Sequence, residues 1–475
     1  MTVSEAPSPA SRRLLPWLVA VAFFMESLDT TILNTAVPAI SAALHVGPLS
    51  MKAVLASYTL SLAVFIPISG WVADRFGTRR VFAVAIGLFT LGSFLCGISS
   101  NIHLLVVCRI LQGCGGSMMV PVGRLTLVRT FAKSELLRTM SFVSIPALIA
   151  PMLGPIAGGL IVGYLHWRAI FFVNIPIGLI GLIMVYIHLP DYREETHPLD
   201  TVGLILFGSG IALLSYVLEV FGEHALSVSE ISGLLVLSLA LLAGYWLHAK
   251  TLEFPLLQLG LFKIRTFRAA VNGSFFTRLG IGGVPFLLPL LYQTGLGYTP
   301  VQSGMLIMPQ ALAALGMKAI LQRLLAKIGY KSVLIANTTA IGLLLVSFTT
   351  IGLHTPVWQI VAIAFFYGAC TSLQYTSMNT LVYADVEEKD ASGASSIAST
   401  MQQMAISFGV AIAGLTTAFF VPRAAYADAA LMIGGIHKAL LCLGGLTLLS
   451  TIVFAGLKRE DGNAVSEQKI MHPDG

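Results

Sequence analysis

Two carboxylates lie inside the first long apolar run of this chain. Glu26 and Asp29 are three residues apart, which places them on one face of a helix. An isolated carboxylate at the middle of a bilayer costs at least about 2.5–3.5 kcal/mol on insertion scales, so such a residue is functional by default. Burial and mutual repulsion favour the protonated form of at least one of them, which suits a group that loads and releases a proton. The plainer alternative is that Asp29 lies near the outer end of the segment and is solvated.

An arginine in the fourth apolar run is the expected partner of these carboxylates. Arg109 is followed by Gln112 and a glycine-rich turn. A cation inside a membrane segment needs a counter-charge or a water-lined cavity, and Asp29 or Glu26 supplies the counter-charge. A fixed cation beside a carboxylate stabilises the charged form until the partners separate. A rocking motion of the helices could therefore switch proton affinity.

A short polar loop between the second and third apolar runs carries a second group of charges. Its marked residues are Gly70, Asp74, Arg75, Gly77, Arg79 and Arg80. Gly70 is expected to allow close backbone approach, and Gly77 a tight turn. Asp74 can meet a helix N-terminus or a basic residue of another helix, while the arginines hold the loop on the cytoplasmic side. An ordinary basic turn explains the arginines alone, so we predict that this loop takes part in gating.

The fifth apolar run is rich in proline and glycine, namely Pro151, Gly154, Pro155, Gly158 and Gly159. Glycines at this density allow tight helix contact, and prolines remove backbone donors and bend the helix. A generic kinked packing helix would have the same composition.

Further polar residues within apolar runs could line a cavity, although hydrogen bonding between helices is the alternative explanation. They are Asn34, Gln112, Arg278, Gln374, Asn379, Gln402 and Gln403. Asn174 and Pro176 are expected to serve helix packing.

The composition indicates a polytopic membrane protein. Of 475 residues, 56% are hydrophobic and 11% charged, whereas soluble domains carry charge on about a quarter of their positions. A phosphate-binding GxxxxGK[ST] loop is absent, so the expected energy source is an ion gradient. The five cysteines form no CxxC pair and the ten histidines no HExxH, so no metal site is expected. The net charge of +6 reflects loop charges and not a nucleic-acid partner.

Fourteen apolar runs are separated by polar breaks. They cover about 14–38, 53–73, 81–99, 104–126, 139–163, 168–189, 200–220, 231–249, 269–292, 300–320, 332–352, 357–380, 393–420 and 436–456. With both termini inside, 21 of the 28 lysines and arginines fall in cytoplasmic segments and four in outer segments, as the positive-inside rule requires. Residues 318–331 read as a degenerate second copy of the gating loop, which implies duplicated halves.

We therefore expect an all-α polytopic membrane protein with 14 transmembrane helices. Residues 1–190 would form an N-terminal six-helix bundle, 191–265 linkers and two extra helices, 266–457 a C-terminal six-helix bundle, and 458–475 a short cytoplasmic tail.

Five motifs in order resemble the major facilitator superfamily, and the stretch Leu28–Pro38 resembles its fourteen-span drug:proton antiporter-2 family. The others are the gating loop, Arg109-Ile-Leu-Gln112-Gly113, the glycine-proline run and the stretch 167–178. Glu26 stands where close relatives are expected to have glutamine. The resemblance implies a central cavity and alternating access. It also implies that Asp29 and Arg109 couple protons, that Glu26 modulates the coupling and that the gating loop latches the outward-open state.

The resemblance thus implies a multidrug:H⁺ antiporter that exports amphipathic compounds across a bacterial inner membrane. It would need no cofactor, because the proton gradient drives it. Its partners would be small-molecule substrates, protons and the lipid bilayer, with a monomer as the working assembly. Two alternatives stay open: a dedicated exporter of one metabolite, and a membrane sensor that does not transport. An enzyme is not expected, since no nucleophile and base occur together.

Overall fold

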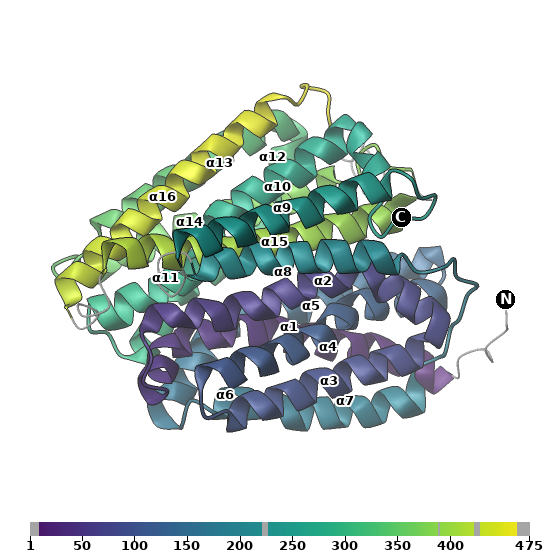
Figure 1. The fold of residues 1–475 in the computed structure, drawn as a ribbon, viewed down its shortest axis with the longest axis horizontal. Helices are drawn as coiled ribbons and strands as arrows, with labels where there is room; N and C mark the ends of the chain where they lie inside the picture. Colours follow the sequence, from purple (N-terminus) through teal and green to yellow (C-terminus); the bar gives the residue numbers. More distant parts are fainter. Residues whose placement is uncertain (1–8, 221–226, 388–389, 422–427, 463–475) are drawn as a thin grey trace.

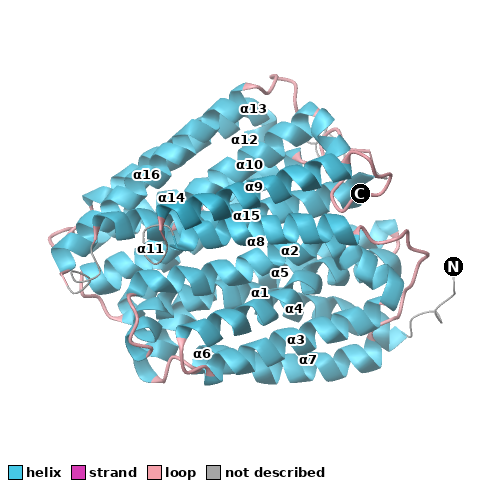
Figure 2. Cartoon of the chain, viewed as in Figure 1, coloured by secondary structure: helices cyan, strands magenta, loops and turns pink. Residues whose placement is uncertain are grey.

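The computed structural model describes residues 9–220, 227–387, 390–421 and 428–462, and all regular elements in these ranges are helical (Figures 1 and 2). A first group of helices comprises α1 (Pro9–Ala43), α2 (Lys52–Phe76), α3 (Thr78–Ile98), α4 (Ile102–Thr130), α5 (Lys133–Tyr164), α6 (Ala169–Phe172) and α7 (Asn174–His188). Two helices follow, α8 (Thr201–Val220) and α9 (Val228–Ala249). A second group comprises α10 (Arg265–Ile281), α11 (Val284–Leu290), α12 (Pro300–Ile328), α13 (Tyr330–Ser347), α14 (Val357–Leu381), α15 (Ala391–Phe420) and α16 (Ala429–Ala455). Most of the predicted tail, residues 463–475, lies outside the described part of the chain.

The apolar runs form helices because every backbone polar group inside a bilayer must be satisfied within its own segment. Thirteen helical segments in the described ranges are long and apolar enough to cross a membrane. Within α5 a shorter apolar helical stretch, Ile149–Tyr164, lies in the run predicted as the fifth span. The count of fourteen spans therefore stays a prediction. The run predicted over 269–292 is divided into α10, α11 and a π-helical turn at Leu291–Gly295.

The helices pack as two groups that meet along one interface. In the first group α1 contacts α4, α5 and α7, and in the second α10 contacts α14, α15 and α16. The interface is made by α2 with α15, α5 with α12 and α1 with α11. Figure 1 shows α8 between the groups, and it contacts α9, α2 and α15. This arrangement agrees with duplicated halves, while the domain boundaries drawn from sequence stay predictions.

The two groups meet at one end of the molecule, where α2 and α12 begin. The Gln293 amide donates to the carbonyl oxygen of Thr35 (2.9 Å), and the Ser407 hydroxyl donates to that of Ala56 (3.1 Å). A Cβ placed at Gly304 in α12 would lie 2.4 Å from the carbonyl oxygen of Pro155. The helix backbones therefore approach closely at this end.

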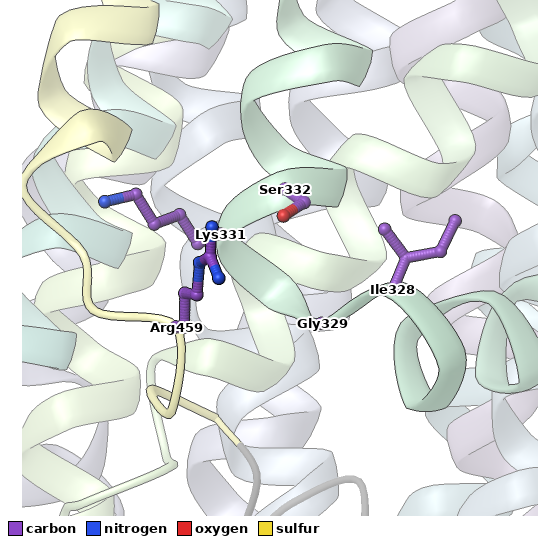
Figure 3. A pocket seen from close by; sticks show the side chains of 5 residues that line it. All are labelled: Ile328, Gly329, Lys331, Ser332 and Arg459. Carbon is purple, nitrogen blue, oxygen red and sulfur yellow. The ribbon is translucent and has the colours of Figure 1, made fainter.

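A glycine turn occurs in both groups. Gly77 joins α2 to α3 with φ of +95°, and Gly329 joins α12 to α13 with φ of +83°. Both lie in the left-handed region that favours glycine. Ile328, Gly329, Lys331, Ser332 and Arg459 line a pocket of about 240 Å³ beside the second turn (Figure 3). The shared geometry supports residues 318–331 as a second copy of the gating loop.

Candidate functional site

A polar network encloses Asp29 in the first group. Arg109 on α4 donates from Nη1 to Asp29 Oδ2 at 2.6 Å, and both side chains are 1% exposed. Gln112 donates to Asp29 Oδ1 at 2.9 Å, and Asn174 on α7 donates to the same oxygen at 3.0 Å. Two helices thus supply three donors to a single carboxylate on α1: two donors come from α4 and one from α7. Both carboxylate oxygens of Asp29 therefore accept hydrogen bonds.

The partners of Arg109 are themselves held in place. Its Nη1 also donates to Gln112 Oε1 at 2.7 Å, and its guanidinium centre lies 4.2 Å from the ring centroid of Tyr58. A Cβ at Gly113 would lie 2.8 Å from the carbonyl oxygen of Tyr58, so this glycine lets α4 approach α2. The close approach of α4 to α2 at Gly113 therefore lies one turn from Arg109, on the helix that brings this arginine to Tyr58 and Asp29.

Glu26 has different surroundings from Asp29. Its side chain is half-buried, and Oε2 is buried with no hydrogen-bond partner among the described residues. The exposed Arg124 stacks over Phe23, three residues before Glu26, at 5.6 Å from the ring centroid. The two carboxylates of α1 are thus separate: Asp29 is enclosed by donors, and Glu26 keeps an oxygen free to bind.

The glycine-proline run in α5 joins α1 to α12. A Cβ at Gly158 would lie 2.4 Å from the carbonyl oxygen of Ile32, and one at Gly154 would lie 2.1 Å from the hydroxyl of Thr31. On the other side, a Cβ at Gly159 would lie 2.5 Å from the carbonyl oxygen of Pro300. Pro151 is exposed. Close packing, predicted for these glycines, is therefore present on α1 beside Asp29 and across the interface between the groups.

The gating loop binds the chain that follows α7. Asp74 accepts from Arg129 on α4 at 2.7 Å, and Arg129 also pairs with Glu194 at 2.9 Å. The backbone N–H of Arg79 donates to Asp191 Oδ1 at 3.1 Å, and its side chain donates to the carbonyl oxygen of Leu189. These contacts tie α2, α4 and residues 189–194 together.

The close approach predicted at Gly70 is wrong. A Cβ at that position would meet no atom within 4 Å, and Gly70 is exposed. At Gly77 the expected tight turn is present, and a Cβ would lie 2.3 Å from Asp191 Oδ1. Arg75 and Arg80 are exposed.

The residues proposed to line a cavity divide into three kinds. Gln374 is fully buried and bonds to Asn337 and Thr338 on α13, so it joins helices and does not line a cavity. Gln112 is also fully buried and belongs to the Asp29 network. The remaining candidates are the exposed Asn379, the half-buried Asn34, Gln402 and Gln403, and the buried Arg278, which lies beside Asn379.

Four residues with clear roles in these networks are missed by the sequence prediction. Asn174, assigned to packing, bonds to Asp29. Arg129, which lies between the fourth and fifth predicted runs, pairs with Asp74. Lys52, which lies between the first and second predicted runs, is 2% exposed and donates to the carbonyl oxygen of Glu219 at 2.6 Å. Tyr58 carries no signal in sequence. Arg129 could have been proposed from the sequence, because Asp74 was expected to meet a helix N-terminus or a basic residue of another helix.

Comparisons with known proteins agree with this architecture. The model of the Major Facilitator Superfamily matches residues 19–410. The chain is 39% identical over 439 residues to MdtD of Serratia proteamaculans, a protein named for multidrug resistance, covering 92% of each chain. It is 38% identical to MdtD of Pectobacterium atrosepticum, covering 94% of this chain and 95% of that one.

Solved structures show the same fold at low identity. A POT family transporter in complex with 5-aminolevulinic acid superposes with a TM-score of 0.67 at 15% identity, covering 93% of this chain and 95% of that one. A bacterial homologue of the human lysosomal transporter Spinster, inward-facing and occupied, gives 0.66 at 12% identity, covering 94% and 97%. Together with the whole-length sequence match, the helix groups and the intramembrane charge network identify this multi-pass membrane protein as a member of the major facilitator superfamily.

Proposed function

We propose that this protein exports amphipathic organic compounds across a bacterial inner membrane in exchange for protons. The observation that carries the proposal is the buried pair of Asp29 and Arg109, which joins α1 to α4. A buried ion pair is costly unless well bonded, so it is weak evidence for a purely stabilising role. The names of the MdtD relatives support multidrug compounds as the substrates.

The way in which the two helix groups meet supports alternating access as the transport mechanism. We place fourteen spans in the membrane, as two six-helix bundles with α8 and α9 beside them and both termini in the cytoplasm. The contacts where α2 and α12 begin would then lie on the outer side, and the conformation would be open to the cytoplasm. Close glycine contacts of α5 with α1 and α12 allow the groups to rock about this interface.

Proton coupling arises from competition for the Asp29 carboxylate. When Arg109, Gln112 and Asn174 donate to it, a proton has to displace a donor. As the groups rock, α1 would shift relative to α4 or α7 within the first group. This shift releases Asp29 to take up a proton, and its reversal expels the proton again. The gating loop, bound through Asp74 and Arg129, would latch one of the two conformations. The cycle uses the proton gradient and no cofactor.

The test is collapse of a pre-formed proton gradient in inverted membrane vesicles on addition of amphipathic cations, dyes and metabolites. Wild-type protein should respond to several unrelated compounds, and Asp29→Asn to none. Glu26→Gln should keep coupled transport, because the Glu26 carboxylate lies outside the Asp29 network. Full proton-coupled transport by Asp29→Asn would contradict the proposal. A response to one compound alone would indicate a dedicated exporter.

A further inference from the structure

Two arginines of the described chain are at least nine-tenths buried, and they differ in their partners. Arg109 faces the carboxylate of Asp29. Arg278, in α10, is 3% exposed and has no carboxylate within ion-pair distance among the residues that the structure describes. A guanidinium is always charged, and no described carboxylate compensates this positive charge inside the second helix group.

Among the residues that the structure describes, Arg278 contacts neutral groups. Its Nε donates to the hydroxyl of Ser274 at 3.0 Å, and its Nη2 lies 3.4 Å from Asn379 Oδ1. Its guanidinium centre lies 3.8 Å from the ring centroid of Tyr375. The aromatic face and the two polar atoms hold the guanidinium in position but supply no full negative charge.

Acidic residues near α10 are already engaged at the start of that helix. Asp461 accepts from Arg265, and Asp385 accepts from the hydroxyl of Thr266 at 2.8 Å. Residues 265 and 278 are thirteen positions apart, so at 1.5 Å per residue these acids bind roughly 20 Å along the helix from Arg278. They do not neutralise it in this conformation.

Access to the guanidinium leads past Asn379. The Asn379 side chain is exposed, and Tyr375 is half-buried. A contact of 3.4 Å is at the weak limit of a hydrogen bond, so an anionic oxygen would displace the Asn379 oxygen with little loss. The charge therefore lies one side chain below an exposed surface of α14.

We propose that Arg278 binds an anionic group, a carboxylate or sulfonate, of the exported compound. This inference rests on the proposed export function. It specifies amphipathic anions as one class of compound that the protein exports. The planar guanidinium suits a two-oxygen group, which it can bind through two parallel hydrogen bonds.

The test uses the full chain in proteoliposomes of zwitterionic lipid, so that lipid headgroups supply no net anion. The probes are a panel of dansyl amino acids and their methyl esters, which differ only in the carboxylate. Binding is followed by fluorescence without a gradient, and transport is followed with one. Arg278→Gln should weaken binding of the acids by about tenfold or more, since one charged hydrogen bond contributes this much, and change the esters less than about twofold.

Two further variants separate charge from structure. Arg278→Lys keeps the positive charge but loses the planar guanidinium that can form two parallel hydrogen bonds. Its affinity for the acids should lie between those of wild type and Arg278→Gln. Asn379→Asp places a carboxylate beside the guanidinium. It should weaken binding of the acids and not of the esters, because the new carboxylate pairs with Arg278. Arg268→Gln removes an exposed charge from the same helix and should leave both probe classes unchanged.

Three outcomes would decide the matter. Equal loss of acids and esters in folded Arg278→Gln protein would overturn the inference and make Arg278 structural. So would wild-type protein that binds esters but no acid of the panel. Selective, Arg278-dependent binding of acids without gradient-driven movement would support the anion site and contradict the export function.

Discussion

Arg109 on α4 and Asp29 on α1 are joined by a 2.6 Å contact between side chains that are both 1% exposed. Eighty positions separate them in sequence, and the helices that carry them belong to the same group. The stability of a charge pair that is enclosed in this way requires both of its members. Removing one of them leaves the other buried without compensation.

We therefore expect Asp29→Ala to lower the free energy of unfolding by about 3–5 kcal/mol, since it leaves the Arg109 charge unpaired. The double variant Asp29→Ala, Arg109→Leu should recover much of this loss because no buried charge remains. Thermal unfolding of the purified protein in detergent measures both. Equal instability of the single and double variants would show that the pair does not act as a unit.

The contact between Asp74 and Arg129 should contribute to the transport cycle. Asp74→Asn and Arg129→Gln are each expected to slow transport, and the double variant should be no slower than the worse single one. The coupling between the two partly exposed side chains should be about 1 kcal/mol in a double-mutant cycle on initial transport rates. Arg138→Gln removes an exposed arginine near the start of α5 and serves as control. Strictly additive effects of the two substitutions would show that Asp74 and Arg129 do not act through their contact.

The close packing of α5 on α1 should be intolerant of one added methyl group. Gly158→Ala would place a carbon 2.4 Å from the carbonyl oxygen of Ile32. This oxygen belongs to the backbone, so no change of side-chain rotamer can relieve the clash. We expect a loss of about 1–3 kcal/mol in stability, as for other overpacked cores, together with impaired transport. Gly434→Ala, where a Cβ meets nothing within 4 Å, should be neutral or slightly stabilising. Similar melting temperatures for the two variants would contradict the packing argument.

Asp200, just before α8, should make the stability of the α8 and α9 region depend on pH. Burial acts to raise the pKa of Asp200, but hydrogen bonds from His248 and from the backbone N–H groups of Gly203 and Leu256 outweigh it, so the pKa lies below the ordinary value. A lowered carboxyl pKa stabilises the folded state above the unfolded-state pKa, and this contribution is lost as the pH falls through the folded-state pKa.

Asp200→Asn is accordingly expected to be less stable than wild type at neutral pH, by about 1–2 kcal/mol as for other lost charged hydrogen bonds. The difference should persist down to the ordinary carboxyl range and shrink below it. Thermal unfolding of both proteins across this pH range provides the measurement. A constant difference at all pH values would assign the effect to packing instead of charge.

Local sequence features predicted most of the helices and one of the key contacts, the pairing of Arg109 with a carboxylate of the first helix. The helix α15, Ala391–Phe420, begins two residues before its predicted start, because a long apolar run between polar breaks specifies a helix by itself. Gly77 was predicted to turn the chain, since the short loop between two runs leaves no room for a wider connection. Gly70 was misjudged because sequence shows a missing Cβ but not the neighbour that would need the space.

What the sequence determined by itself is the membrane class, the approximate helix positions and the presence of charges where water is scarce. These follow from hydrophobic length and from the cost of intramembrane charge, both of which are local properties. Only the tertiary structure decided which charges are neutralised. Asn174 reaches Asp29 from 145 positions away, whereas Arg278 has no described acid beside it, because helix rotation and packing depth select the partner. Those variables depend on the whole bundle, and no single segment encodes them.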